Sequence, residues 1–410
     1  MTTTIFEIIL IICALIYALV SRTIVNIFTM LTLPYFLIVI INNTYMYKQG
    51  FLVVSGQVMN FLAISFIVFG VGGVTVKALR NFSNSRNKHI IRDPRMYNYR
   101  AILMYVICVG IAVFAKLAIA VLQHGVSYLG SEDFAGYLLG GISGKLMITA
   151  YPLAPIILFH WFEQKSDLKY LIGYLLIVSL TFLTFVKYHI ISLIIITFIY
   201  LLVKNRKFAF ESATVFAIAI PLVFVLNYYV SFRVRGVAVQ SSFYVQHFWN
   251  YVGGSILNDN NALSFGFRRD TTVFYKLISF IDPLVNMFIQ PFGLSLPEHT
   301  KLVFSQVGAD PTFTTNVLDQ FAYLFDSANY GDRTLVYGIV VFLFGGISEV
   351  VFQGLLSNKS EGRLLSAIVF TNFFLILGFF GTFYVQPVPW LWLLSAAVMP
   401  NLFAVKEKIK

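Results

Sequence analysis

The feature that most constrains this chain is a series of long apolar runs that recur from one end of the sequence to the other. A helix needs roughly 20 apolar residues to cross the hydrocarbon core of a bilayer. The sequence predicts about eleven such helices, at residues 5–20, 24–41, 58–76, 101–122, 143–162, 170–186, 188–203, 208–230, 334–356, 364–385 and 389–405. We therefore expect an all-α polytopic membrane protein.

The composition excludes an ordinary soluble domain. Hydrophobic residues make up 58% of the chain and charged residues 11%, whereas soluble proteins carry about 25% charged residues. The run at residues 5–20 has no basic segment before it and no small-residue cleavage site after it. It is therefore predicted to be a retained helix and not a removed signal.

The net charge of +11 is predicted to reflect membrane topology and not nucleic-acid binding. Lysine and arginine accumulate in cytoplasmic loops, and residues 77–100 carry seven of them against the single acid Asp93. The basic residues at 165–169, 204–207, 359–363 and 406–410 then fall on the same side. This pattern predicts an N-terminus outside and a cytoplasmic C-terminus.

One long stretch of mixed character, residues 231–333, interrupts the apolar runs. It divides the chain into eight helices in residues 1–230, a large extracytoplasmic loop, and three helices in residues 334–410. Within the loop, residues 273–289 are nearly apolar enough to cross, but they contain Lys276, Asp282 and Pro283. We expect a helix lying in the outer interface; a crossing there would move the basic C-terminus outside.

Several cations are predicted to gather at the outer headgroup level without matching carboxylates. Each lysine alone is explained equally well by snorkelling of its ammonium group to the interface. Together they suit a phosphate-bearing lipid, because ammonium groups and arginine forks bind diphosphate oxygens. The candidate diphosphate ligands are Lys116, Lys145, Lys187, Arg233 and Arg235.

The large loop also carries the residue types that recognise sugars, which are carboxylates and amides beside aromatic faces. We predict glycan contacts from Trp249, Tyr251, Asn316 and Asp319. Motifs for a nucleotide-binding P-loop or for a zinc site are absent from the sequence. Its cysteines, Cys13 and Cys108, lie in apolar runs. We therefore expect neither a metal nor another cofactor.

Three short segments resemble the Wzy-type oligosaccharide repeat-unit polymerases. They are Tyr251-Val252-Gly253-Gly254-Ser255-Ile256, Thr315-Asn316-Val317 leading through Tyr323 to Asn329-Tyr330-Gly331, and the corner Lys187-Tyr188-His189. The resemblance covers the layout from about residue 170 to 350. The chain departs from the family at Lys187, where arginine is frequent, and at Asn329-Tyr330, where Asp-Phe is frequent.

The resemblance implies a glycosyltransferase that polymerises glycan on the outer side of a bacterial cytoplasmic membrane. Its substrates would be polyprenyl-diphosphate-linked oligosaccharides, and a chain-length regulator would be a further partner. The diphosphate leaving group would be held by Arg233 and Arg235 with help from Lys187. Asp259 or His247 would be the base that takes the proton from the acceptor hydroxyl.

Two other functions remain open at the level of sequence. A ligase of the O-antigen type, which is also a lipid-linked glycan transferase, shares this architecture and differs in its acceptor. A repeat-unit flippase would also present cations to a lipid diphosphate, but it would need them along a path to the inner face. The predicted cations lie toward one face, which favours a polymerase over a flippase.

Overall fold

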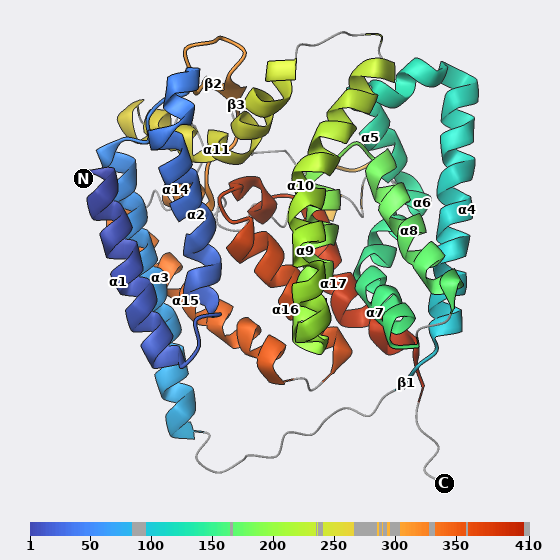
Figure 1. Cartoon of the computed structure of the whole chain (residues 1–410), viewed down its shortest axis with the longest axis horizontal. Coiled ribbons are helices and arrows are strands. Elements are labelled where there is room, and N and C mark those ends of the chain that lie inside the picture. The colour runs from blue at the N-terminus through green and yellow to red at the C-terminus, as the bar shows by residue number, and fades with distance from the viewer. Residues whose placement is uncertain are drawn as a thin grey trace. The chain divides into compact units, whose positions relative to one another are not determined.

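Nearly all regular structure in the computed structural model of this chain is helical (Figure 1). The structure describes residues 1–83, 96–164, 167–234, 236, 241–265, 285–286, 289, 293–295, 304–327, 333–357 and 360–405. The α-helices are α1 (Thr3–Ser21), α2 (Ile27–Thr44), α3 (Gly56–Ser83), α4 (Tyr99–His124), α5 (Glu132–Leu139), α6 (Gly141–Ala150), α7 (Ala154–Gln164), α8 (Leu168–Leu183), α9 (Lys187–Lys204), α10 (Arg206–Val234), α11 (Ser241–Phe265), α14 (Gln320–Ser327), α15 (Arg333–Ser357), α16 (Glu361–Phe370) and α17 (Pro387–Leu402).

The remaining elements are short. The described strands form two antiparallel pairs, β1 (Met96–Tyr97) with β4 (Ala404–Val405) and β2 (Ser305–Gln306) with β3 (Thr314–Thr315). Short 3-10 segments are η1 (Met46–Gln49), η3 (Val126–Gly130), η4 (Tyr151–Leu153) and η7 (Gly381–Tyr384), and η6 (Thr371–Ile376) is π-helical.

Eight helical segments of the described chain are long and apolar enough to cross a membrane. They are Thr3–Ser21, Ile27–Thr44, Gly56–Arg80, Tyr99–His124, Gly141–Glu163, Lys187–Lys204, Arg206–Val234 and Thr334–Leu355. Each coincides with a predicted span. The prediction of a helical, multi-pass membrane protein is confirmed at this level, although the described residues contain fewer such segments than the eleven predicted.

The other three predicted spans take different forms. The runs at 170–186 and 389–405 become α8 and α17, with 16 residues each. The run at 364–385 is broken, because its backbone leaves the helix to bond to another segment. Gly381 donates its N–H to the Leu318 carbonyl at 2.9 Å, and a Cβ added at Gly381 would lie 2.5 Å from that oxygen.

The large loop predicted at residues 231–333 contains regular structure that the sequence analysis did not assign. The helix α11 occupies 25 of these residues, and the β2–β3 pair and α14 follow it. The interfacial helix predicted at 273–289 lies almost entirely outside the described residues.

The chain divides into two compact units, each built from three stretches of sequence. Unit 1 consists of Met1–His89, Val245–Leu356 and Phe373–Trp390, and unit 2 of Ile90–Tyr244, Ser357–Asn372 and Leu391–Lys410. In unit 1, α1, α2 and α3 pack together. Glycines bring α3 against α15: a Cβ at Gly72 would lie 2.0 Å from the Phe342 carbonyl oxygen.

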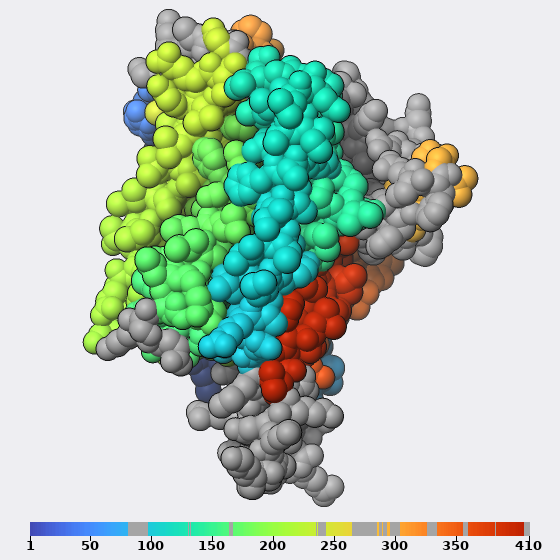
Figure 2. Space-filling model, turned by 90° about the vertical axis from the view of Figure 1, so that its right-hand side faces the viewer, coloured from blue at the N-terminus to red at the C-terminus, as the bar shows by residue number. Residues whose placement is uncertain are grey.

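In unit 2, α9 packs against α10 and α16, and α4 packs against α6 and α8. Large apolar side chains of α4 are exposed, among them Met104, Ile111 and Leu122. Figure 2 shows α4 in cyan, running along this face beside the green α8. Exposed apolar surface of this kind on a helix long enough to span is the surface that lipid tails cover.

Candidate active site

The helix α11 is buried on all sides over residues 253–259, and asparagine side chains fix it to the backbone of neighbouring segments of unit 1. Asn258 Nδ2 donates to the Val317 carbonyl at 2.9 Å. Asn260 accepts the Ser55 N–H at 2.9 Å and donates to the Val53 carbonyl at 2.9 Å. These bonds hold the intervening residue, Asp259, in one position within unit 1.

The Asp259 carboxyl lies close to a second aspartate, Asp319, which is 60 residues further along the chain. The backbone N–H of Asp319 donates to Asp259 Oδ1 at 3.3 Å. Asp319 directly precedes α14 and acts as its N-cap, since Asp319 Oδ1 accepts the Ala322 N–H at 2.5 Å. Both aspartates have no exposed surface.

Tyrosines from two spanning helices of unit 1 face this carboxyl pair. Tyr35 of α2 lies near Asp319 and favours the charged form of the Asp319 carboxyl. The Tyr35 hydroxyl is nevertheless outside hydrogen-bond geometry with the described residues. Tyr337 of α15 shares a 2.5 Å hydrogen bond with the Ser65 hydroxyl. The second oxygen of each carboxyl, Oδ2, has no hydrogen-bond partner among the described residues. No salt bridge of the described residues involves either carboxyl.

Burial makes both carboxyls weaker acids than an exposed aspartic acid. The pKa of Asp259 lies well above its usual range, because the group is buried and because the charge of Asp319 is close. Burial raises the pKa of Asp319 to about 7, against the opposing effect of the Ala322 N–H and the Tyr35 hydroxyl. A carboxyl with a pKa near neutrality suits proton transfer at neutral pH.

The other residues predicted for glycan contact or catalysis in unit 1 occupy other positions. His247 lies on α11, twelve residues before Asp259, which is about 18 Å along the helix axis. Trp249 is buried, and its indole N–H donates to Asn42 at 3.0 Å. The Tyr251 ring packs on Phe380 with centroids 4.8 Å apart. Asn316, just after β3, is half-buried.

The described diphosphate-ligand candidates all belong to unit 2, and Arg235 lies outside the described residues. Arg233 is exposed at the end of α10, and its Nε donates to the Tyr229 hydroxyl at 3.3 Å. Lys187, the first residue of α9, places its ammonium 4.2 Å from the centre of the Tyr228 ring.

The two remaining lysines have different surroundings. Lys145, on α6, is half-buried. Lys116 of α4 donates to the Gly140 carbonyl at 2.6 Å and to the Leu138 carbonyl at 3.4 Å. It therefore binds the carbonyl end of α5, where a cation is favourable.

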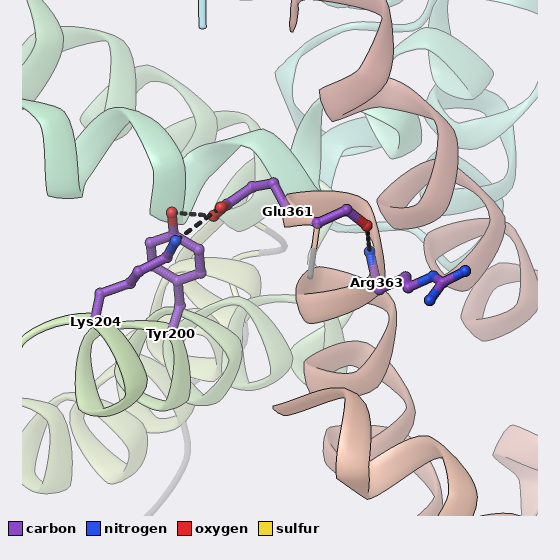
Figure 3. Close-up of polar contacts among 5 residues, drawn as sticks. Tyr200, Lys204, Glu361 and Arg363 are labelled. Carbon is purple, nitrogen blue, oxygen red and sulfur yellow. Dashed lines mark hydrogen bonds and ion pairs between the residues drawn. The ribbon is translucent and has the colours of Figure 1, made fainter. Parts of the chain in front are cut away.

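Unit 2 holds a buried carboxylate whose oxygens are both occupied. Glu361 Oε2 forms a salt bridge of 2.8 Å with Lys204, and Glu361 Oε1 accepts a hydrogen bond from the Tyr200 hydroxyl (Figure 3). These contacts join the start of α16 to the end of α9. Ser360 caps α16 by accepting the Arg363 N–H at 3.3 Å. With its charge compensated, Glu361 serves to fix these helices together.

The residue types alone predict separate roles for Asp259 and Asp319 and no role for Tyr35. Nothing in a spacing of 60 residues signals that two carboxyls meet, and a tyrosine within an apolar run is common. The helix α11 did carry a signal in the helical spacing of Val245, Trp249 and Val252.

Comparison with protein-family models, with curated proteins and with solved structures finds no match to this chain.

Proposed function

We propose that this protein joins polyprenyl-diphosphate-linked oligosaccharide units into a polysaccharide at the outer side of a bacterial cytoplasmic membrane. The observation that carries the proposal is the Asp259–Asp319 pair. It lies in the region whose motifs resemble the repeat-unit polymerases, and raised pKa values suit its carboxyls to acid–base work.

The proposed reaction needs one proton acceptor and no nucleotide. The acceptor hydroxyl oxygen forms a bond to the anomeric carbon of the donor glycan. The bond from that carbon to the diphosphate oxygen breaks, and its electron pair leaves with the lipid diphosphate. The hydroxyl proton passes to the Asp259–Asp319 pair. Because both carboxyls are buried, the acceptor has to open the packing around them before it reacts.

The cations of unit 2, taken by themselves, are candidate ligands for a lipid diphosphate. Arg233 is the strongest candidate, since its guanidinium is exposed and is free of any salt bridge with the described residues. A guanidinium binds two phosphate oxygens at once. Lys116 is a weaker candidate than the sequence suggested, because backbone carbonyls already occupy its ammonium.

The second candidate is proton-coupled transport of the same lipid-linked unit. It is favoured by one observation, that the carboxyl pair is buried in a multi-pass membrane protein. Ionisable groups in such positions often carry protons in transporters. A ligase is the third possibility, with the polysaccharide end moved to a different acceptor.

Deletion of the gene in the organism that carries it separates these functions. A polymerase predicts loss of the long polysaccharide ladder on a gel, with single repeat units still present on the outer leaflet. Repeat units held on the inner leaflet would instead identify a transporter. A polymer of normal length that stays on its lipid carrier would identify a ligase, and an unchanged ladder on its normal acceptor would rule out all three.

A further inference from the structure

The Asp259–Asp319 pair is unusual because two carboxyls share a dry environment without a counter-ion from the described residues. Two neighbouring carboxylates in such surroundings cannot both be ionised at modest cost. Among the described residues, the titratable groups that face them are the hydroxyls of Tyr35 from α2 and Tyr337 from α15, and neither is cationic. Within the described part of the chain the pair thus lacks a compensating charge, which a bound proton would supply.

We infer that Asp259 and Asp319 hold one proton between them, with the proton on Asp259 and the negative charge on Asp319. The geometry supports a proton over a metal cation. The described residues contain no group of three metal-binding acidic, histidine or cysteine side chains. Among the described residues, the Oδ2 atom of each aspartate lacks a hydrogen-bond partner, and a proton on Asp259 Oδ2 would turn that atom into a hydrogen-bond donor.

The two aspartates differ in how well their surroundings stabilise a negative charge. Asp319 caps α14, so its carboxylate accepts a short bond from the Ala322 N–H and lies at the positive end of the helix. The Tyr35 hydroxyl adds to this effect. From the described residues, Asp259 accepts only the longer bond of the Asp319 N–H. Of the two, Asp319 is thus the better site for the charge.

This assignment changes which residue takes the substrate proton, a consequence that rests on the proposed function. An aspartic acid that already carries a proton cannot act as a base. Asp319 would accept the proton from the acceptor hydroxyl, and the neutral Asp259 would position it. Asp259→Asn preserves a neutral side chain of the same shape, whereas Asp319→Asn removes the base but keeps an N-cap.

Infrared spectroscopy of the purified, full-length protein in lipid nanodiscs tests the proton assignment without any measurement of activity. At neutral pH we expect the C=O stretch of a protonated carboxylic acid, which shifts on labelling with isotopic aspartate. The band should disappear in Asp259→Asn and persist in Asp319→Asn. The control is Asp133→Asn, at an exposed aspartate of α5.

Three results would overturn the inference. Absence of an aspartic-acid band from the wild type would show that no proton is held, and this measurement needs no variant to fold. Loss of the band only in Asp319→Asn would place the proton on the other residue. Loss of the band on adding sodium, but not choline, would identify a metal-ion site.

Elongation rates then test the consequence for catalysis separately. Asp319→Asn should lower the rate by about 100-fold or more. Asp259→Asn should lower it less, and its rate should still fall at acidic pH as the rate of the wild type does. If the infrared result holds and neither variant affects elongation, the proton assignment stands and the catalytic role of the pair fails. If the wild type elongates nothing, the proposed function itself fails. If the greater loss falls on Asp259→Asn, Asp319 is not the base.

Discussion

At the scale of single residues, the buried carboxyls of unit 1 make the stability of the protein depend on pH. The folded state raises the pKa of Asp319 to about 7 and raises that of Asp259 as well, so both bind protons more tightly in the folded state than in the unfolded state. The stabilisation is complete below the ordinary aspartate pKa of about 4, and the part from Asp319 is lost as the pH rises through about 7.

We therefore predict a melting temperature several degrees lower at about pH 8 than at about pH 5, with a contribution from Asp319 of roughly 2–3 kcal/mol. Asp319→Asn should reduce this difference, because asparagine is neutral at both pH values and still caps α14. The measurement is thermal unfolding of the protein in detergent. A variant that keeps the full pH dependence would show that the carboxyl titrates normally.

Glu361 in unit 2 supplies a contrasting case, since its charge has a cationic partner. Lys204→Met would leave a carboxylate that is 9% exposed without its salt bridge, and we expect a loss of about 1–3 kcal/mol. Tyr200→Phe removes one neutral donor and should cost about 1 kcal/mol. Adding Glu361→Gln to Lys204→Met should restore part of the lost free energy of unfolding. If the losses of the Glu361→Gln and Lys204→Met single variants simply add in the double variant, the two residues do not interact.

At the scale of helices, the contact between α3 and α15 depends on reciprocal glycines. A Cβ at Gly345 would lie 2.0 Å from the Phe69 carbonyl oxygen, just as one at Gly72 would meet Phe342. Small residues allow membrane helices to approach this closely. Overlap with a backbone atom cannot be relieved by a side-chain rotation, so the helices would have to separate.

Gly345→Ala should thus destabilise the protein by about 1–3 kcal/mol. The matched control is Gly338→Ala on the same helix, where nothing lies within 4 Å of the added Cβ. That change should be neutral or stabilise by up to about 1 kcal/mol through helix propensity. Chemical unfolding in mixed micelles measures both, and equal effects would contradict a close contact at Gly345.

Sequence patterns predict the elements of this molecule to different degrees. Apolar runs locate most spanning helices, since lipid requires roughly 20 apolar residues in succession. They do not reveal that the run at 364–385 breaks, because the break depends on contacts of Gly381 with a distant segment. The helical spacing of α11 is a weak signal in the sequence, because its buried asparagines are of a type that is common in loops.

At the scale of the whole molecule, the sequence predicts single residues of the candidate site but does not predict that they lie together. The sequence indicated Asp259 as a proton acceptor and Asp319 as a glycan contact. Their pairing depends on tertiary packing of α11 against the segment before α14, and no local pattern encodes that contact. The predicted diphosphate ligands and predicted catalytic residues also fall in different units, a division that charge placement alone did not suggest.

The central claim is that the Asp259–Asp319 pair serves the elongation of lipid-linked glycans. The most direct measurement uses purified protein in liposomes, supplied only with polyprenyl-diphosphate-linked repeat units and analysed on a gel. Wild type and Asp133→Asn should produce a ladder of products longer than one repeat, and the double variant Asp259→Asn/Asp319→Asn should produce none. A folded wild type that makes no ladder, or a double variant that makes a full one, would contradict the claim.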